Sequence, residues 1–71
     1  MTDTERLRAV ISESGLKLSF IAKKIGITPY GLSLKIENKN EFKASEIQTL
    51  KEMLNLSNKE RDSIFFVKRV D

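Results

Sequence analysis

Apolar residues recur at helical spacing along most of the chain. Leu7, Val10 and Ile11 lie three and four positions apart, so they form one face of a helix over residues 2–14. The same periodicity predicts further helices over 18–25, 29–37 and 44–54, and a fifth from residue 58 onward. The inward-facing side chains of these four helices are Ile21, Ile25, Leu32, Ile36, Ile47, Leu50 and Ile64. The pattern therefore predicts an all-α fold. The tail V-K-R-V-D alternates only weakly, so it could form a short strand, a helix end or a frayed end.

Capping residues indicate where the outer helices begin and end. Thr2 and Glu5 have the spacing of a capping box, in which a hydroxyl and a carboxylate satisfy the first backbone N–H groups. Gly15 suits the end of that helix, because glycine accepts the left-handed conformation. Ser57 and Glu60 form a second capping box, so the last helix is expected to begin at Asn58.

The segment 18–37 predicts two short helices joined by a tight turn. Gly26 suits a sharp helix end, Thr28 is a good N-cap, and Pro29 is favoured as a first helical residue. Ala22 is small where the two helices must cross closely. This is the helix-turn-helix pattern, whose second helix can lie in the major groove of DNA.

Length and composition restrict the class of protein further. A chain of 71 residues is expected to form one compact domain, spanning residues 1–71, with marginal stability. It contains no Cys and no His, so we expect no disulfide, no metal site, no cofactor and no catalytic residue. No apolar run approaches the roughly 20 residues that span a bilayer. The start T-D-T-E is unlike a basic signal peptide, so a cytoplasmic protein without a membrane partner or small-molecule substrate is expected.

Positive charge is concentrated in the middle of the chain. The net charge is −1 over residues 1–14, +4 over 15–43 and zero over 44–71. Nucleic-acid binding predicts such a distribution, because phosphate contacts supply most of the sequence-independent affinity for DNA. The alternative is that these lysines only keep a small surface soluble.

The segment L-S-F-I-A-K-K-I-G-I-T-P-Y-G-L-S-L-K-I-E-N-K-N-E-F resembles the helix-turn-helix of the lambda repressor and Cro family. With the following S-E-I and the terminal F-F, residues 5–66 resemble small single-domain regulators of Gram-positive prophages. The resemblance implies a five-helix lambda-repressor-like domain, with operator DNA as partner and a homodimer on a two-fold site. It would make the chain a Cro-like or repressor-like transcriptional regulator that acts by occluding its operator.

The resemblance also implies which residues contact DNA. Base edges would be read by the start and the outer face of the third helix, and phosphates by the start of the second helix and the loop after the third. The implied base-reading residues are Thr28, Pro29, Tyr30, Ser33 and Leu34. The phosphate-contacting candidates are Lys17, Ser19, Asn38, Lys39, Asn40 and Lys43, to which the positive charge of Lys35 adds one more.

Several features of these candidates come from their residue types. The third helix has no Arg, Gln or Asn, so the bidentate pairings with guanine and adenine are missing. The Tyr30 hydroxyl is expected to reach a base edge or a phosphate and its ring a thymine methyl group, the alternative being that Tyr30 covers the edge of the core. Leu34 is expected either to contact a thymine methyl group or to be an exposed leucine without a DNA role. Lys17 offers no side-chain cap, which leaves the first N–H groups of its helix to a phosphate. Glu37 is expected to pair with Lys35 or Lys39, the alternative being that it accepts a hydrogen bond from cytosine N4.

Gly31 and Lys43 leave two further points open. Gly31 costs about 1 kcal/mol relative to Ala inside a helix. Close approach by DNA or by the preceding helix would explain it, and a tolerant position is the alternative. Lys43 stands where a Ser or Thr cap is usual, and Glu46 three residues on supplies half of a capping box.

The C-terminal helix and tail, residues 58–71, are too apolar to be only a frayed end. One of the two phenylalanines is expected to close the core. The dimer interface predicted here consists of Phe65, Phe66, Val67 and Val70, the alternative being that all of them fold back onto the first helix.

Two other functions remain open on the sequence alone. One is a protein-interaction module, such as an antirepressor or accessory factor, that keeps the fold without reading DNA. The scarcity of polar residues on the third helix favours it. The other is an architectural or excision factor that binds DNA with little sequence preference.

Overall fold

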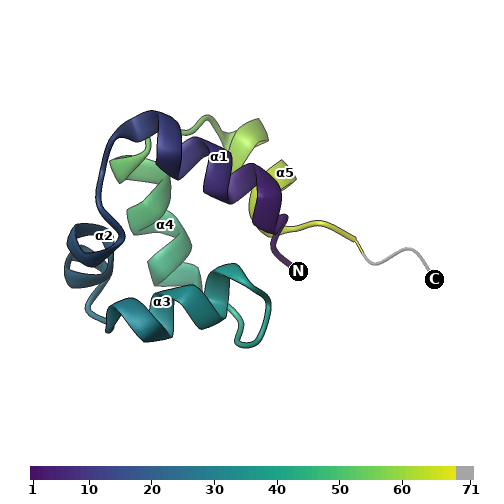
Figure 1. Cartoon of the computed structure of the whole chain (residues 1–71). Helices are drawn as coiled ribbons and strands as arrows, with labels where there is room; N and C mark the ends of the chain where they lie inside the picture. The colour runs from purple at the N-terminus through teal and green to yellow at the C-terminus, as the bar shows by residue number, and fades with distance from the viewer. Residues whose placement is uncertain (69–71) are drawn as a thin grey trace.

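Five helices follow one another along the chain and pack around one core (Figure 1). The computed structural model describes residues 1–68. The helices are α1 (Thr4–Ser14), α2 (Leu18–Ile25), α3 (Pro29–Ile36), α4 (Ala44–Met53) and α5 (Asn58–Phe65). Within residues 1–68 there is no strand, and no helix is long and apolar enough to cross a membrane. The predicted all-α five-helix fold is confirmed.

The core takes side chains from every helix. The apolar face predicted for each helix is the buried one, and α2 contacts both α3 and α4, so the two short helices are held from two sides. Ala22 is fully buried, which is consistent with the close crossing of α2 and α3. The buried apolar residues are Leu7, Ile11, Ile21, Ala22, Leu32, Ile36, Ile47, Leu50, Leu56, Ile64 and Phe65.

The first helix begins two residues later than predicted, and its cap is different. Asp3, rather than Thr2, is the N-cap of α1, and its Oδ1 accepts a hydrogen bond from the Arg6 N–H at 3.0 Å. Thr2 lies one residue before the cap and is buried, so the predicted box of Thr2 with Glu5 is wrong. The sequence offers three candidate caps in a row, and the Asp3 N–H is fixed by a tertiary bond to the Ile64 carbonyl at 2.7 Å.

The other predicted helix ends agree closely with the structure. Gly15 and Gly26 end α1 and α2 with φ of 74° and 90°. Ser57 and Glu60 form the predicted capping box of α5. The helix α3 ends at Ile36 and α4 at Met53, each one residue before the predicted end. Residues 66–68 have no regular secondary structure, and the last three residues of the V-K-R-V-D tail lie outside the described residues.

Candidate nucleic-acid interface

The turn between α2 and α3 is fixed by local hydrogen bonds. The Gly26 N–H donates to the Ala22 carbonyl at 2.9 Å, which closes α2. The Thr28 hydroxyl then accepts from the Gly31 N–H at 3.0 Å and caps α3, and Pro29 fills the first helical position as predicted. A Cβ at Gly31 would lie 3.2 Å from Thr28 Oγ1, tighter than most such contacts. Crowding by the cap therefore explains Gly31 without any close approach by DNA or by α2.

The outer face of α3 is available to a partner. Tyr30 is 74% exposed, and Thr28 and Pro29 beside it are also exposed. Ser33 and Leu34 are partly exposed, and Leu34 is not among the apolar side chains that pack against the core in the part of the chain described. In Figure 1, α3 lies along one edge of the molecule, with the other helices on one side of it. Each of the residues implied as base-reading is therefore at least partly accessible to a partner.

Lys35 is not available for the phosphate contact predicted for it. Its Nζ lies 2.5 Å from Glu46 Oε1, and the two side chains are only 12% and 7% exposed. The same carboxylate oxygen accepts the Lys43 N–H at 2.8 Å, as half a capping box. Burial raises the pKa of Glu46, but the hydrogen bonds and positive charges of Lys35 and Lys43 outweigh this effect, so the pKa lies below its usual value. The pair ties α3 to the start of α4.

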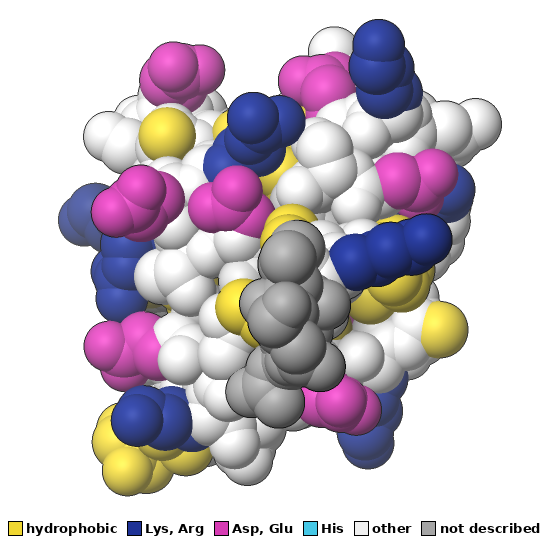
Figure 2. Space-filling model, turned by 90° about the vertical axis from the view of Figure 1, so that its right-hand side faces the viewer, with side chains coloured by type: hydrophobic (Ala, Val, Ile, Leu, Met, Phe, Trp, Pro, Cys, Tyr) yellow, Lys and Arg dark blue, Asp and Glu magenta, His cyan; other side chains and the backbone are white. Residues whose placement is uncertain are grey.

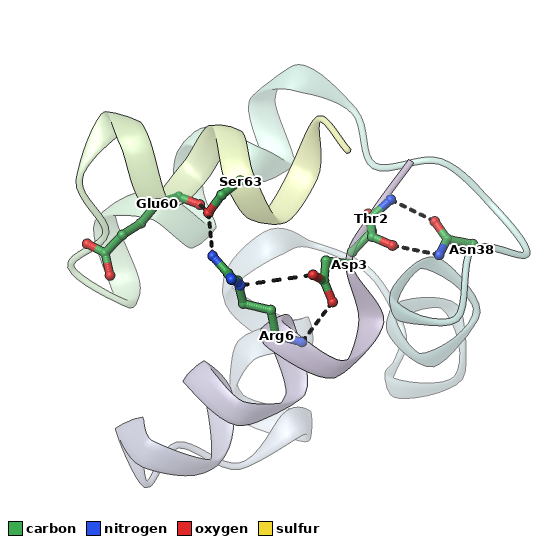
Figure 3. A network of polar contacts seen from close by, with 6 residues as sticks. All are labelled: Thr2, Asp3, Arg6, Asn38, Glu60 and Ser63. Carbon is green, nitrogen blue, oxygen red and sulfur yellow. Dashed lines mark hydrogen bonds and ion pairs between the residues drawn. The ribbon is translucent and has the colours of Figure 1, made fainter. Parts of the chain in front are cut away.

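Asn38 is also occupied within the protein, contrary to the prediction of a phosphate contact. It has a left-handed backbone, with φ of 64°. Its side-chain amide accepts the Thr2 N–H at 2.8 Å and donates to the Thr2 carbonyl at 2.7 Å (Figure 3). It also donates to the Thr4 hydroxyl at 3.3 Å. Asn38 therefore fastens the N-terminal segment to the loop that follows α3, and its polar groups are not free for DNA.

Glu37 pairs across helices rather than with a neighbouring lysine. Its Oε2 lies 3.8 Å from Arg8 Nη2 on α1, and both side chains are half exposed. The expected pairing with Lys35 or Lys39 is therefore wrong. Since Arg8 offsets its charge, the carboxylate repels a phosphate less than an isolated one would.

The remaining phosphate-contacting candidates are exposed. Lys17 and Ser19 lie at the start of α2, where no side chain caps the helix, as the sequence predicts. Lys39 and Asn40 follow α3, and their N–H groups both donate to the Leu34 carbonyl, which holds the loop close to the helix end. Lys43 is exposed at the start of α4. Exposed lysines thus occur both before α2 and after α3.

One exposed aromatic residue on α2 was not predicted as a surface feature. Phe20 is 44% exposed, and Lys24 Nζ lies 5.5 Å from the centre of its ring. Phe20 is an apolar residue directly before the buried Ile21, so the sequence pattern does not indicate that the Phe20 side chain is exposed.

The predicted dimer residues divide between the core and the surface. Phe65 is buried and meets Phe42 edge to face, with 5.3 Å between ring centres, so its assignment to an interface is wrong. Phe66 is 57% exposed and Val67 is partly exposed, whereas Val70 lies outside the described residues. Phe66 also lines a hollow of about 200 Å³ together with Met1, Phe42 and Ile47. Figure 2 shows acidic and basic side chains interspersed on the face of the molecule that lies on the right in Figure 1.

Among residues 1–68, no group of three or more acidic side chains could hold a metal ion. Comparisons with protein-family models, with curated proteins and with solved structures found no match to this chain.

Proposed function

We propose that this chain is a sequence-specific DNA-binding regulator, similar in action to Cro or a repressor, that occludes its operator. The observation that carries the proposal is the accessible outer face of α3, with exposed lysines before α2 and after α3. A helix that follows a tight turn and lies along one edge of a domain can enter the major groove. Lysines that precede and follow this helix in the sequence can contact the phosphate backbone.

The phosphate contacts assigned to each subunit come from three lysines, because Lys35 is engaged with Glu46. Lys17, Lys39 and Lys43 would release counterions on binding and give a slope of log K against log salt of about −2.7 per monomer. We further propose a homodimer formed through Phe66 and Val67, which would place the two α3 helices about 34 Å apart on successive turns of DNA.

Selection from a pool of random-sequence duplexes, followed by anisotropy titrations over a salt series, tests this function. We expect a defined sequence to be enriched and its affinity to fall steeply with salt. Lys39→Ala should reduce the slope by about 1, whereas Lys35→Met should leave the slope unchanged. Lys59→Ala, on α5, is the matched control for a lysine remote from α3.

A protein-interaction module is the second candidate, favoured by the apolar Tyr30 and Leu34 on the outer face of α3. It predicts no salt-sensitive DNA binding and a stable complex with another protein. An architectural or excision factor would instead bind every duplex in the pool with similar affinity.

A further inference from the structure

None of the four residues on the outer stripe of α3 carries a positive charge. Tyr30, Ser33, Leu34 and Glu37 lie at positions i, i+3, i+4 and i+7, so they share one face. Of these, Glu37 is engaged with Arg8, and the nearby Lys35 is turned away into its pair with Glu46. Besides the half-exposed carboxylate of Glu37, the stripe presents outward a phenol, a hydroxyl and an isobutyl group.

Such a stripe can read only some of the features of a base pair. Guanine is usually recognised by Arg or Lys, and adenine by Asn or Gln, through paired hydrogen bonds to the base edge. The stripe has none of these groups. The C5-methyl group of thymine is the one apolar feature in the major groove of unmodified DNA, and apolar side chains recognise it by contact.

We propose that this surface recognises the 5-methyl groups of thymine, so that its preferred duplex carries thymines at the base pairs that face Tyr30 and Leu34. The inference rests on the proposed function and specifies its ligand. Tyr30 extends from the first turn of α3 with most of its surface in solvent, and the exposed Pro29 beside it enlarges the apolar contact. Leu34 lies one turn further along the same stripe.

The expected size of the effect follows from the area of one methyl group. Removing a buried methyl is expected to weaken binding about fourfold, and two such contacts in one half-site about 15-fold. The lysines make no contribution to this preference, because phosphate contacts carry no direct sequence information.

The test compares thymine with uracil in the duplex enriched from the random-sequence pool. Deoxyuridine keeps the base pairing and lacks only the methyl group. Thymines are replaced one at a time, and the affinity of the full chain is measured at one fixed salt concentration. We expect losses of about fourfold, confined to a few positions in each half-site.

Variants identify the side chains involved. Leu34→Ala and Tyr30→Ala should each lower the affinity for the thymine duplex and abolish the uracil effect at one of these positions. Tyr30→Phe, which keeps the ring, should keep the effect. Lys39→Ala is the control, because it should weaken the thymine and uracil duplexes by the same factor. Circular dichroism verifies that each variant is folded.

Distinct outcomes would overturn the inference and the proposed function. Salt-dependent, sequence-selective binding with equal affinity for thymine and uracil duplexes would overturn the inference and leave the function standing. Enrichment of a sequence without thymine, or small losses spread evenly over all thymines, would do the same. Absence of salt-sensitive DNA binding would overturn the proposed function and the inference with it.

Discussion

The pair of Lys35 with Glu46 should be essential for stability, although both residues look like ordinary surface charges in the sequence. Removing one member leaves the other charge buried, with side chains only 12% and 7% exposed. Breaking a buried pair in this way costs about 3–5 kcal/mol. We expect the lower end, about 3 kcal/mol, because Lys35 retains some access to water.

The size of this loss is large for a domain of this length. At roughly 0.05–0.15 kcal/mol per residue, the whole chain has a free energy of unfolding of about 4–11 kcal/mol. Lys35→Met keeps the apolar stem and removes the ammonium. Glu46→Gln keeps an acceptor for the Lys43 N–H, so it separates loss of the ion pair from loss of the helix cap. Each single variant and the double variant complete a thermodynamic cycle.

Urea unfolding followed by circular dichroism measures the cycle. Each single variant should lower the free energy of unfolding by about 3 kcal/mol, and the double variant should lose less than the sum, with a coupling of about 1–3 kcal/mol. An unchanged m value would show that the variants differ from the wild type in stability and not in the surface exposed on unfolding. A cost below about 0.5 kcal/mol for Lys35→Met would refute the reasoning, since exposed pairs behave in that way.

Three further predictions concern other contacts of the structure. Asn38→Gly keeps the left-handed backbone but leaves the buried Thr2 N–H without its acceptor, so urea unfolding should show a loss of about 1–3 kcal/mol; an unchanged midpoint would contradict the role of this clamp. Because folding lowers the pKa of Glu46, the stabilisation that this carboxylate provides is complete above its pKa of 4.5 in the unfolded chain. That stabilisation is lost as the pH falls through the lower pKa of the folded state. Wild type should therefore lose more stability than Glu46→Gln between neutral and acidic pH, and parallel urea midpoints across that range would argue against it. Phe66→Ser should shift sedimentation equilibrium towards monomer while circular dichroism shows an unchanged helix content, and an unaltered mass would remove Phe66 from the interface.

The sequence predicts most of the fold because the signals for it are local. Gly26, Thr28 and Pro29 determine the turn between α2 and α3 through bonds that span three or four residues, and the structure contains each of them. The start of α1 was predicted less well. Asp3 stands beside Thr2, and a distant bond to Ile64 selects which of them caps the helix.

The candidate site was predicted only in part because its polar residues have distant partners. Lys35 pairs with a residue 11 positions later, and Asn38 with one 36 positions earlier. Neither separation has a signature in helical periodicity, which describes faces of one helix and not contacts between helices. A lysine on a basic segment and an asparagine in a polar loop therefore look available to DNA when they are not.

These internal contacts determine which residues are left to supply affinity for DNA and which are left to supply base selectivity. Lys35, Glu37 and Asn38, three polar residues in and just after α3, are engaged with other parts of the domain. With Lys35 and Asn38 engaged in this way, the main features left for a DNA partner are the exposed lysines, the short polar side chains of Ser19, Ser33 and Asn40, and the stripe of Tyr30 and Leu34. On the proposed function, the lysines supply salt-dependent affinity and the stripe supplies base preference. The two properties should then be separable by mutation, since no residue left on this surface combines a positive charge with a position on the outer stripe of α3.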